Sequence, residues 1–121
     1  MSEPRLLPLH GHAVSDVTGT GRFVLFFDDP AQSRLSLDGS FQIRVDNETQ
    51  EYTPLNPDWV RDVLLSFVGV RVNSARYNRR SRLIIRFSDD RELIIDDGPF
   101  ENWHYSNSSG LSLHGGVGKV S

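Results

Sequence analysis

The sequence predicts an α+β fold: an antiparallel β-sheet or sandwich built from two pseudo-repeated β-meanders with one helix between them. Three observations support this prediction. In each half of the chain, apolar and polar residues alternate with the period of a strand between turn-forming residues. Residues 57–68 instead repeat their apolar positions with the period of a helix. The two halves also resemble each other when they are aligned.

The first half begins with a predicted hairpin. In RFVLFF, the alternate residues Phe23, Leu25 and Phe27 share one face, and after the turn DDPAQS the strand RLSL returns. Val24 and Phe26 make the opposite face apolar as well. We therefore expect both faces of this strand to be covered.

A further strand follows in SFQIRV, with Phe41, Ile43 and Val45 on one face. A two-residue hairpin at Asp38 and Gly39 would mix core and solvent positions on the same face. We therefore expect a three-residue loop, or a kinked continuous strand, at Gly39.

The helix is predicted at residues 57–68. Asn56 is suited to the N-cap, and Leu55 is placed to pack on Val60 as a hydrophobic staple. Gly69 supplies the expected C-terminal stop. The face that should dock on the sheet consists of Val60, Val63, Leu64 and Phe67.

The second half repeats the pattern of the first. The segment SRLIIRF alternates like a strand, and the two aspartates after it suit a turn into ELII. The pseudo-repeats run from about 6–45 and about 64–105 within one domain at 1–121. The matching pairs are Gly11 with Gly69, Val14 with Val72, Phe27 with Phe87, Leu35 with Leu93, and Phe41 with Phe100. Duplication predicts a pseudo-twofold pairing of the meanders, although two unrelated amphipathic hairpins would also align in this way.

Bulk properties narrow the classes of function. A chain of 121 residues is large enough for one hydrophobic core. The absence of cysteine excludes disulfides, thiolate metal sites and cysteine nucleophiles. The N-terminal stretch lacks the continuous apolar region of a secretory signal, and no run is long enough to span a membrane, so we expect a cytoplasmic protein without a membrane partner. The net charge of −3 argues against a nucleic-acid partner.

The second half carries a Leu-Leu-x-x-x-Gly-x-x-Val element, a Phe-x-Asp-Gly-like hairpin and a C-terminal Glu-x-Trp…Gly-Gly segment, here Glu101, Trp103, Gly115 and Gly116. In these features it resembles a family of small uncharacterised actinobacterial domains of unknown function. The sequence departs from the family at 88–91, where a hairpin glycine is expected. The resemblance implies no established reaction, cofactor or partner. Some similar domains are immunity partners of toxins, so that role is included among the expectations.

The histidines suggest a metal site as an alternative. His10 and His12 would project from one face of a strand, a spacing that can chelate a metal ion. Glu101, His104 and His114 would complete a zinc set. In an extended segment, however, His104 points away from Glu101, and His114 takes an outward position. We therefore expect surface or hydrogen-bonded histidines, and a His-dependent metal-binding enzyme that uses His10, His12 and His104 is the alternative.

No motif identifies a catalytic site. The serines near His104 lack the Gly-x-Ser-x-Gly context of a hydrolase, and adjacent aspartates on a strand point to opposite faces. The glycines near the C-terminus fit neither a Walker loop nor a dinucleotide fingerprint. We therefore predict no catalytic residue and no cofactor.

The basic run NSARYNRRSRL is the strongest indication of a partner. Its members are Arg76, Arg79, Arg80 and Arg82, which should cluster around Tyr77 in a loop before the next strand. Arginines beside an exposed aromatic ring can bind phosphates, a stacked base or an acidic protein surface. A solvated loop whose arginines offset nearby aspartates is the simpler alternative.

The sequence therefore predicts a non-enzymatic bacterial protein-interaction module. Its partner is another protein or a second copy of the chain, bound through an open strand edge or a sheet face. A nucleic-acid-binding accessory protein that uses the loop at 76–82 is an alternative. Phe100, Trp103, Gly115 and Gly116 are expected to be structural, because they close the fold and let backbones approach closely.

Overall fold

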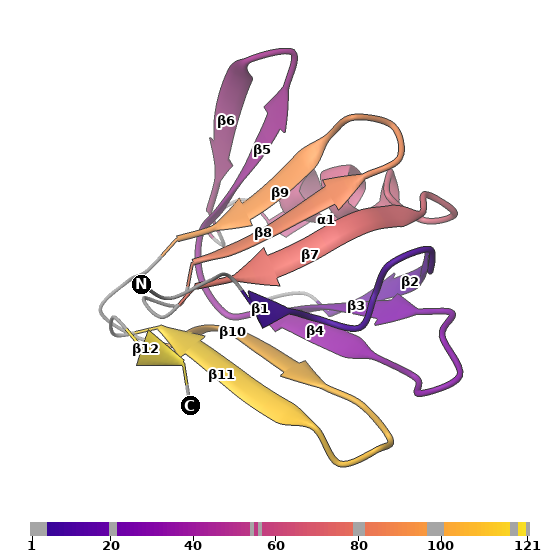
Figure 1. Cartoon of the computed structure of the whole chain (residues 1–121). Coiled ribbons are helices and arrows are strands. Elements are labelled where there is room, and N and C mark those ends of the chain that lie inside the picture. The colour runs from indigo at the N-terminus through magenta and orange to yellow at the C-terminus, as the bar shows by residue number, and fades with distance from the viewer. Residues whose placement is uncertain are drawn as a thin grey trace.

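The structure is a computed structural model that describes residues 5–19, 22–53, 55, 57–78, 82–96, 101–116 and 119–120. Two antiparallel sheets face each other, with one short helix beside them (Figure 1). The chain is mostly β. The predicted antiparallel sandwich with a single helix is therefore confirmed at this level.

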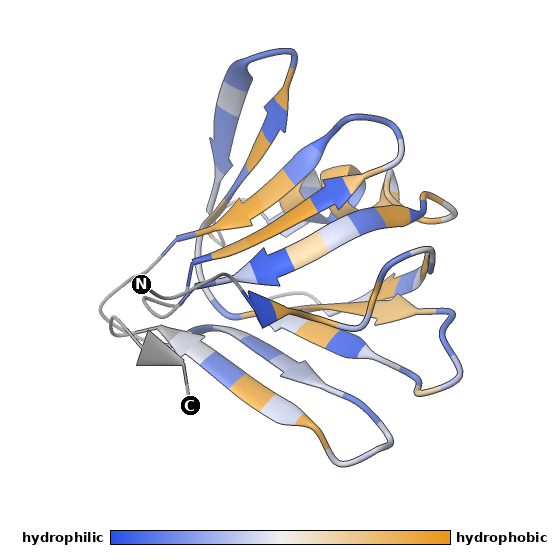
Figure 2. Ribbon diagram, viewed as in Figure 1, coloured by the Kyte–Doolittle hydropathy of each residue, from blue (hydrophilic) through white to orange (hydrophobic). Residues whose placement is uncertain are grey.

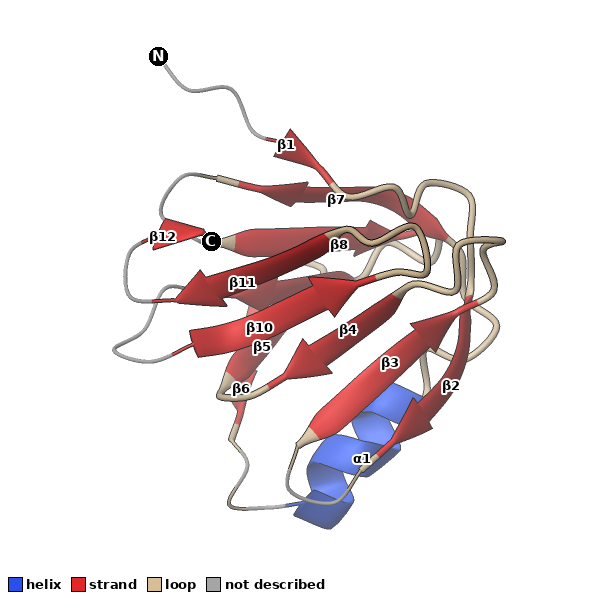
Figure 3. Cartoon of the chain, turned by 90° about the horizontal axis from the view of Figure 1, so that it is seen from below, coloured by secondary structure: helices blue, strands red, loops and turns tan. Residues whose placement is uncertain are grey.

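Sheet I has the strand order β1-β7-β8-β9-β5-β6. Its strands are β1 (Arg5–Leu6), β5 (Phe41–Val45), β6 (Glu48–Tyr52), β7 (Val72–Tyr77), β8 (Leu83–Phe87) and β9 (Glu92–Ile95). Sheet II has the order β12-β11-β10-β4-β3-β2, which Figure 3 shows from below. Its strands are β2 (Val14–Thr18), β3 (Phe23–Phe27), β4 (Arg34–Leu37), β10 (Glu101–Ser106), β11 (Ser112–Gly116) and β12 (Lys119–Val120).

The strand that follows each three-stranded meander belongs to the opposite sheet. β2, β3 and β4 form a meander in sheet II, and β5 then pairs with β9 of sheet I. β7, β8 and β9 form a meander in sheet I, and β10 then pairs with β4 of sheet II. The segment 38–40, where we expected a loop or a kink, is therefore a crossover between the sheets.

Matching backbone hydrogen bonds join the two meanders. The Gly11 N–H donates to the Val72 carbonyl at 2.8 Å, and the Gly69 N–H donates to the Val14 carbonyl at 2.8 Å. Gly11 has φ of 80° and Gly69 has φ of 86°, a conformation that glycine adopts without a side-chain clash. Each glycine thus lies just before one meander and donates a hydrogen bond to the first strand of the other meander.

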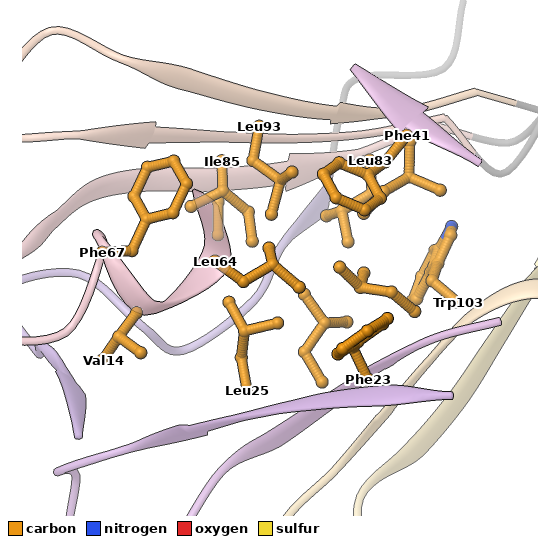
Figure 4. Close-up of a cluster of buried hydrophobic side chains, with 14 of the residues drawn as sticks. Val14, Phe23, Leu25, Phe41, Leu64, Phe67, Leu83, Ile85, Leu93 and Trp103 are labelled. Carbon is orange, nitrogen blue, oxygen red and sulfur yellow. The ribbon is translucent and has the colours of Figure 1, made fainter. Parts of the chain in front are cut away.

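The core lies between the two sheets. Leu25 of β3 and Ile85 of β8, both fully buried, extend toward each other from opposite sheets (Figure 4). The outward residues of β3, Val24 and Phe26, are half-buried. Figure 3 shows no helix or strand of the described chain over this side of β3, so the expected covering of both faces was wrong. By contrast, only the last residue of β6 is buried, and Figure 2 shows this edge strand as mostly hydrophilic. The core therefore narrows toward β6.

The helix α1 (Pro57–Leu65) is shorter than the predicted 57–68. Its Val60 and Leu64 are buried, and Leu64 reaches the space between the sheets (Figure 4). Phe67 follows the helix end and packs on Phe87, with ring centroids 4.4 Å apart. After the helix end the backbone bonds are of the i to i−3 type, from Phe67 to Leu64 and from Val68 to Leu65, so the last turn is tightened.

Two predicted features of the helix ends were wrong. Leu55 is 88% exposed, so it makes no hydrophobic staple with Val60. Gly69 lies beyond the helix end at Leu65, and its N–H joins β2, so it is not the stop of the helix. Asn56, the expected N-cap, lies outside the described residues.

Candidate interaction surface

The outer side of sheet I carries arginines around a small apolar centre. Strand β8 buries Leu83, Ile85 and Phe87, so Ile84 and Arg86 point outward. By register, one lateral row of outward residues is Leu6, Arg76, Ile84, Ile94, Gln42 and Glu51. The next row is Ser74, Arg86, Glu92, Arg44 and Thr49. We call this surface the arginine face and define it by Arg44, Arg76, Arg82, Ile84, Arg86 and Ile94.

Ion pairs neutralise part of this surface. Arg44 Nη2 lies 2.8 Å from Glu92 Oε1, and Arg82 Nε lies 2.9 Å from Asp96 Oδ1. Arg76 and Arg86 are exposed, and within the described part of the chain their side chains make no hydrogen bond or ion pair. These two guanidinium groups are therefore available to a partner.

The apolar centre of the arginine face is small. Ile84 and Ile94 are direct cross-strand neighbours on β8 and β9. Ile94 is only 4% exposed, whereas Ile84 is half-buried. The contact area for a partner is thus centred on Ile84 and bordered by Arg76 and Arg86.

Arg76, the first member of the predicted arginine loop, lies on a strand instead. Arg76 belongs to β7, and it points outward because Ala75 and Tyr77 on either side point into the core. The Tyr77 ring is 8% exposed, and its centroid is 5.8 Å from that of Trp103. The prediction of Tyr77 as a partner-binding residue was therefore wrong.

The remaining members of the predicted cluster have mixed outcomes. Arg82 is exposed just before β8, and its N–H donates to Asn78 Oδ1 at 3.1 Å. Arg79 and Arg80 lie outside the described residues. Arg44 and Arg86 were not predicted as members of this surface. Arg86 lies between the buried Ile85 and Phe87, and Arg44 follows the buried Ile43. Alternation therefore predicts that both arginines point outward, but only the strand order places both beside Arg76.

The candidate metal ligands are not brought together as a set. His10 and His12 lie in the turn before β2, so the expected strand spacing was wrong. His10 Nδ1 is 2.6 Å from the Asn73 carbonyl oxygen, and His12 Nδ1 is 3.5 Å from Asp28 Oδ1. Among the described residues, no three His, Asp or Glu side chains group as a metal site. His104 lies on β10, and the side chain of Glu101 is outside the described part.

The C-terminal segment packs against the core. Trp103 and Tyr105 of β10 are fully buried. Gly115 lies opposite Trp103, and a Cβ at Gly115 would come 2.0 Å from the indole ring. Gly116 continues β11 opposite Glu101, and Phe100 lies outside the described residues. Glycine is thus required at 115 because the Trp103 ring occupies the space of a side chain.

A buried polar network holds two loops at one end of sheet II. Ser33 Oγ donates to Asp29 Oδ2 at 2.5 Å and lies 2.7 Å from the Tyr105 hydroxyl. Asn107 Nδ2 donates to that hydroxyl at 3.1 Å. The Ser108 N–H and hydroxyl both donate to the Ala31 carbonyl, at 2.7 and 2.8 Å. Because these contacts connect the β3–β4 and β10–β11 loops, we assign the network a structural role.

Comparison of the chain with protein-family models, curated proteins and solved structures found no match. The resemblance to actinobacterial domains therefore stays a prediction. In the described part of the structure, no helix combines the length and apolar character needed to cross a membrane.

Proposed function

We propose that this chain is a non-enzymatic protein-interaction module whose arginine face binds an acidic protein surface. The observation that supports this most is the placement of Arg76 and Arg86 beside Ile84 on the outer side of sheet I, outside any ion pair in the described structure. Arginine is enriched among residues that dominate binding energy, and its planar guanidinium matches a carboxylate with two hydrogen bonds.

The arrangement favours a protein over a nucleic acid. Binding of single strands relies on exposed aromatic rings that stack with bases. Tyr77, the aromatic residue within the basic run, is directed into the core instead. The net charge of −3 is also unfavourable for a polyanion. An acidic patch on a folded protein requires only a local cluster of cations, which the arginine face supplies.

We infer a cytoplasmic bacterial setting, and an immunity protein that binds a toxin is one form of this function. A second copy of the chain is the other partner considered. Gene neighbourhood separates these two forms, because an immunity protein is expected beside the gene of its toxin. A self-association would instead appear as a concentration-dependent change in sedimentation.

We further propose that the two meanders arose by duplication of one unit. Ala13 and Arg71, which match in the aligned repeats, bridge each other in antiparallel fashion. The pairs β2–β3 and β7–β8 both show a register irregularity after their first valine. By register with β4 and β9, the counterpart of Phe41 is Trp103, so the expected match with Phe100 needs correction.

The proposed function is tested by charge reversal on the arginine face. The variant Arg76→Glu/Arg86→Glu changes two exposed residues, and Arg34→Glu, an exposed arginine on the outer side of sheet II, is the matched control. Purified protein is used to capture its partner from the source cell, and affinity is then measured at two salt concentrations.

The double variant should bind at least about tenfold more weakly, a loss of about 1.4 kcal/mol, and wild-type affinity should fall with added salt. Arg34→Glu should bind like the wild type. Full affinity of the double variant, or a strictly monomeric protein with no stoichiometric partner, would contradict the proposal.

A further inference from the structure

His104 and His114 form a stacked pair on the outer side of sheet II. They are direct cross-strand neighbours on β10 and β11. Their ring centroids lie 3.9 Å apart, and the ring planes differ by 11°. Trp103 and Tyr105, on either side of His104, point into the core, so the imidazoles point outward. The predicted zinc set placed His104 and His114 together with His10, His12 and Glu101, whereas the fold brings His104 against His114.

The surroundings of this pair are polar and small. His104 Nε2 lies 2.9 Å from the Ser112 hydroxyl, two residues before His114 on the same strand. On its other side, His104 is opposite Ser36 of β4. Both side chains are half-buried, so solvent reaches part of each ring, while His114 Nδ1 is itself buried. Hydroxyl groups thus occupy two neighbouring positions in the register, and the exposed Arg34 lies two residues from Ser36 on the same face of β4.

We propose that His104 and His114 together bind one divalent transition-metal ion, with Cu²⁺ preferred. Imidazole nitrogen is a favoured ligand of copper, nickel and zinc, at about 2.0–2.1 Å from zinc. Directly opposed residues of an antiparallel pair have Cβ atoms about 4.5–5.5 Å apart, so both rings can reach a shared ion with one nitrogen each once they rotate out of the stack. The ion replaces the contact between His104 and the Ser112 hydroxyl, and water completes its coordination.

The rigid sheet is what distinguishes this pair from isolated surface histidines. Once one imidazole holds the ion, the second binds it intramolecularly, at a high effective concentration. Ligating imidazoles must be neutral, so binding weakens as the pH falls. The site lies on sheet II, and the proposal is therefore independent of the arginine face on sheet I.

The test uses the full chain without a histidine tag, titrated with Cu²⁺ by calorimetry and followed by electron paramagnetic resonance. We expect one equivalent of Cu²⁺ bound through two nitrogen ligands, and weaker binding of Ni²⁺ and Zn²⁺. His104→Gln and His114→Gln should each lower the affinity at least about tenfold, because each leaves a single imidazole. His10→Gln/His12→Gln is the matched control and should bind like the wild type.

Two results would overturn the proposal. One is wild-type affinity in both single variants, and the other is loss of the bound ion in the His10→Gln/His12→Gln control. The urea midpoint gives a second readout, because an ion that binds only the folded state raises it. That increase should disappear in His104→Gln and persist in the control, and an increase that persists in His104→Gln counts against the site.

Discussion

Substitution of Gly115 by alanine tests the packing of the C-terminal segment most sharply. A Cβ at this position would lie 2.0 Å from Cε2 and Nε1 of Trp103, where ordinary contact begins at 3.4 Å. The ring or the strand must therefore shift by about 1.4 Å, although Trp103 is fully buried and close-packed. Overpacking of a core costs about 1–3 kcal/mol, so we expect Gly115→Ala to lower the free energy of unfolding by about 3 kcal/mol.

The source of this cost is identified by a double-mutant cycle with Trp103→Ala. Removal of the indole alone should cost about 3–5 kcal/mol, as for other buried aromatic residues. In that background the clash is gone, and alanine should stabilise the strand by about 0.5–1 kcal/mol relative to glycine. Urea unfolding followed by far-UV circular dichroism gives all four values. Equal costs of Gly115→Ala with and without the indole would refute this explanation.

Further predictions concern the buried network, the two glycines and a surface ion pair, all measured by urea unfolding. Tyr105→Phe removes a hydroxyl that contacts Ser33 and Asn107, so it should cost about 1–2 kcal/mol, and unchanged stability would argue against the network. Gly11→Ala and Gly69→Ala have open space for a methyl group but positive φ, so each should cost about 1–2 kcal/mol, and a gain in stability would contradict the backbone conformation. Arg44→Ala breaks a half-exposed ion pair with Glu92 and should lower the free energy of unfolding by less than about 1 kcal/mol. A larger loss would contradict the assignment of this pair as an ordinary surface ion pair.

Local sequence patterns predicted where the strands lie and which way they face better than they predicted which strands pair with each other. The alternation in LIIRF gave the inward face of β8 correctly, because a strand exposes every second residue to the same side. The crossovers to β5 and β10 were not predicted, since no local pattern states which sheet a strand joins. The apolar period also continued past the helix end, because Phe67 is buried in the tightened turn that follows Leu65 and so occupies a position that fits the helical period.

The candidate surface was predicted only in part for the same reason. Arg76 and Arg82 were recognised because they lie close together in the sequence. Arg44 and Arg86 come from separate strands, and only pairing through β9 brings them near Arg76. The contact between His104 and His114 depends on the β10–β11 register. The sequence therefore placed both histidines in one candidate set but did not show that they are direct neighbours.

The central claim, that the arginine face binds the partner, is tested most directly by site-specific photo-cross-linking in the source cell. A photoreactive residue replaces Ile84 at the centre of the face. In the control it replaces Val24, which has the matching place on the outer side of sheet II. The account predicts that position 84 cross-links an acidic protein, that Arg76→Glu abolishes this product, and that position 24 gives none. Cross-linking of the same protein from position 24 but not from position 84 would contradict the claim.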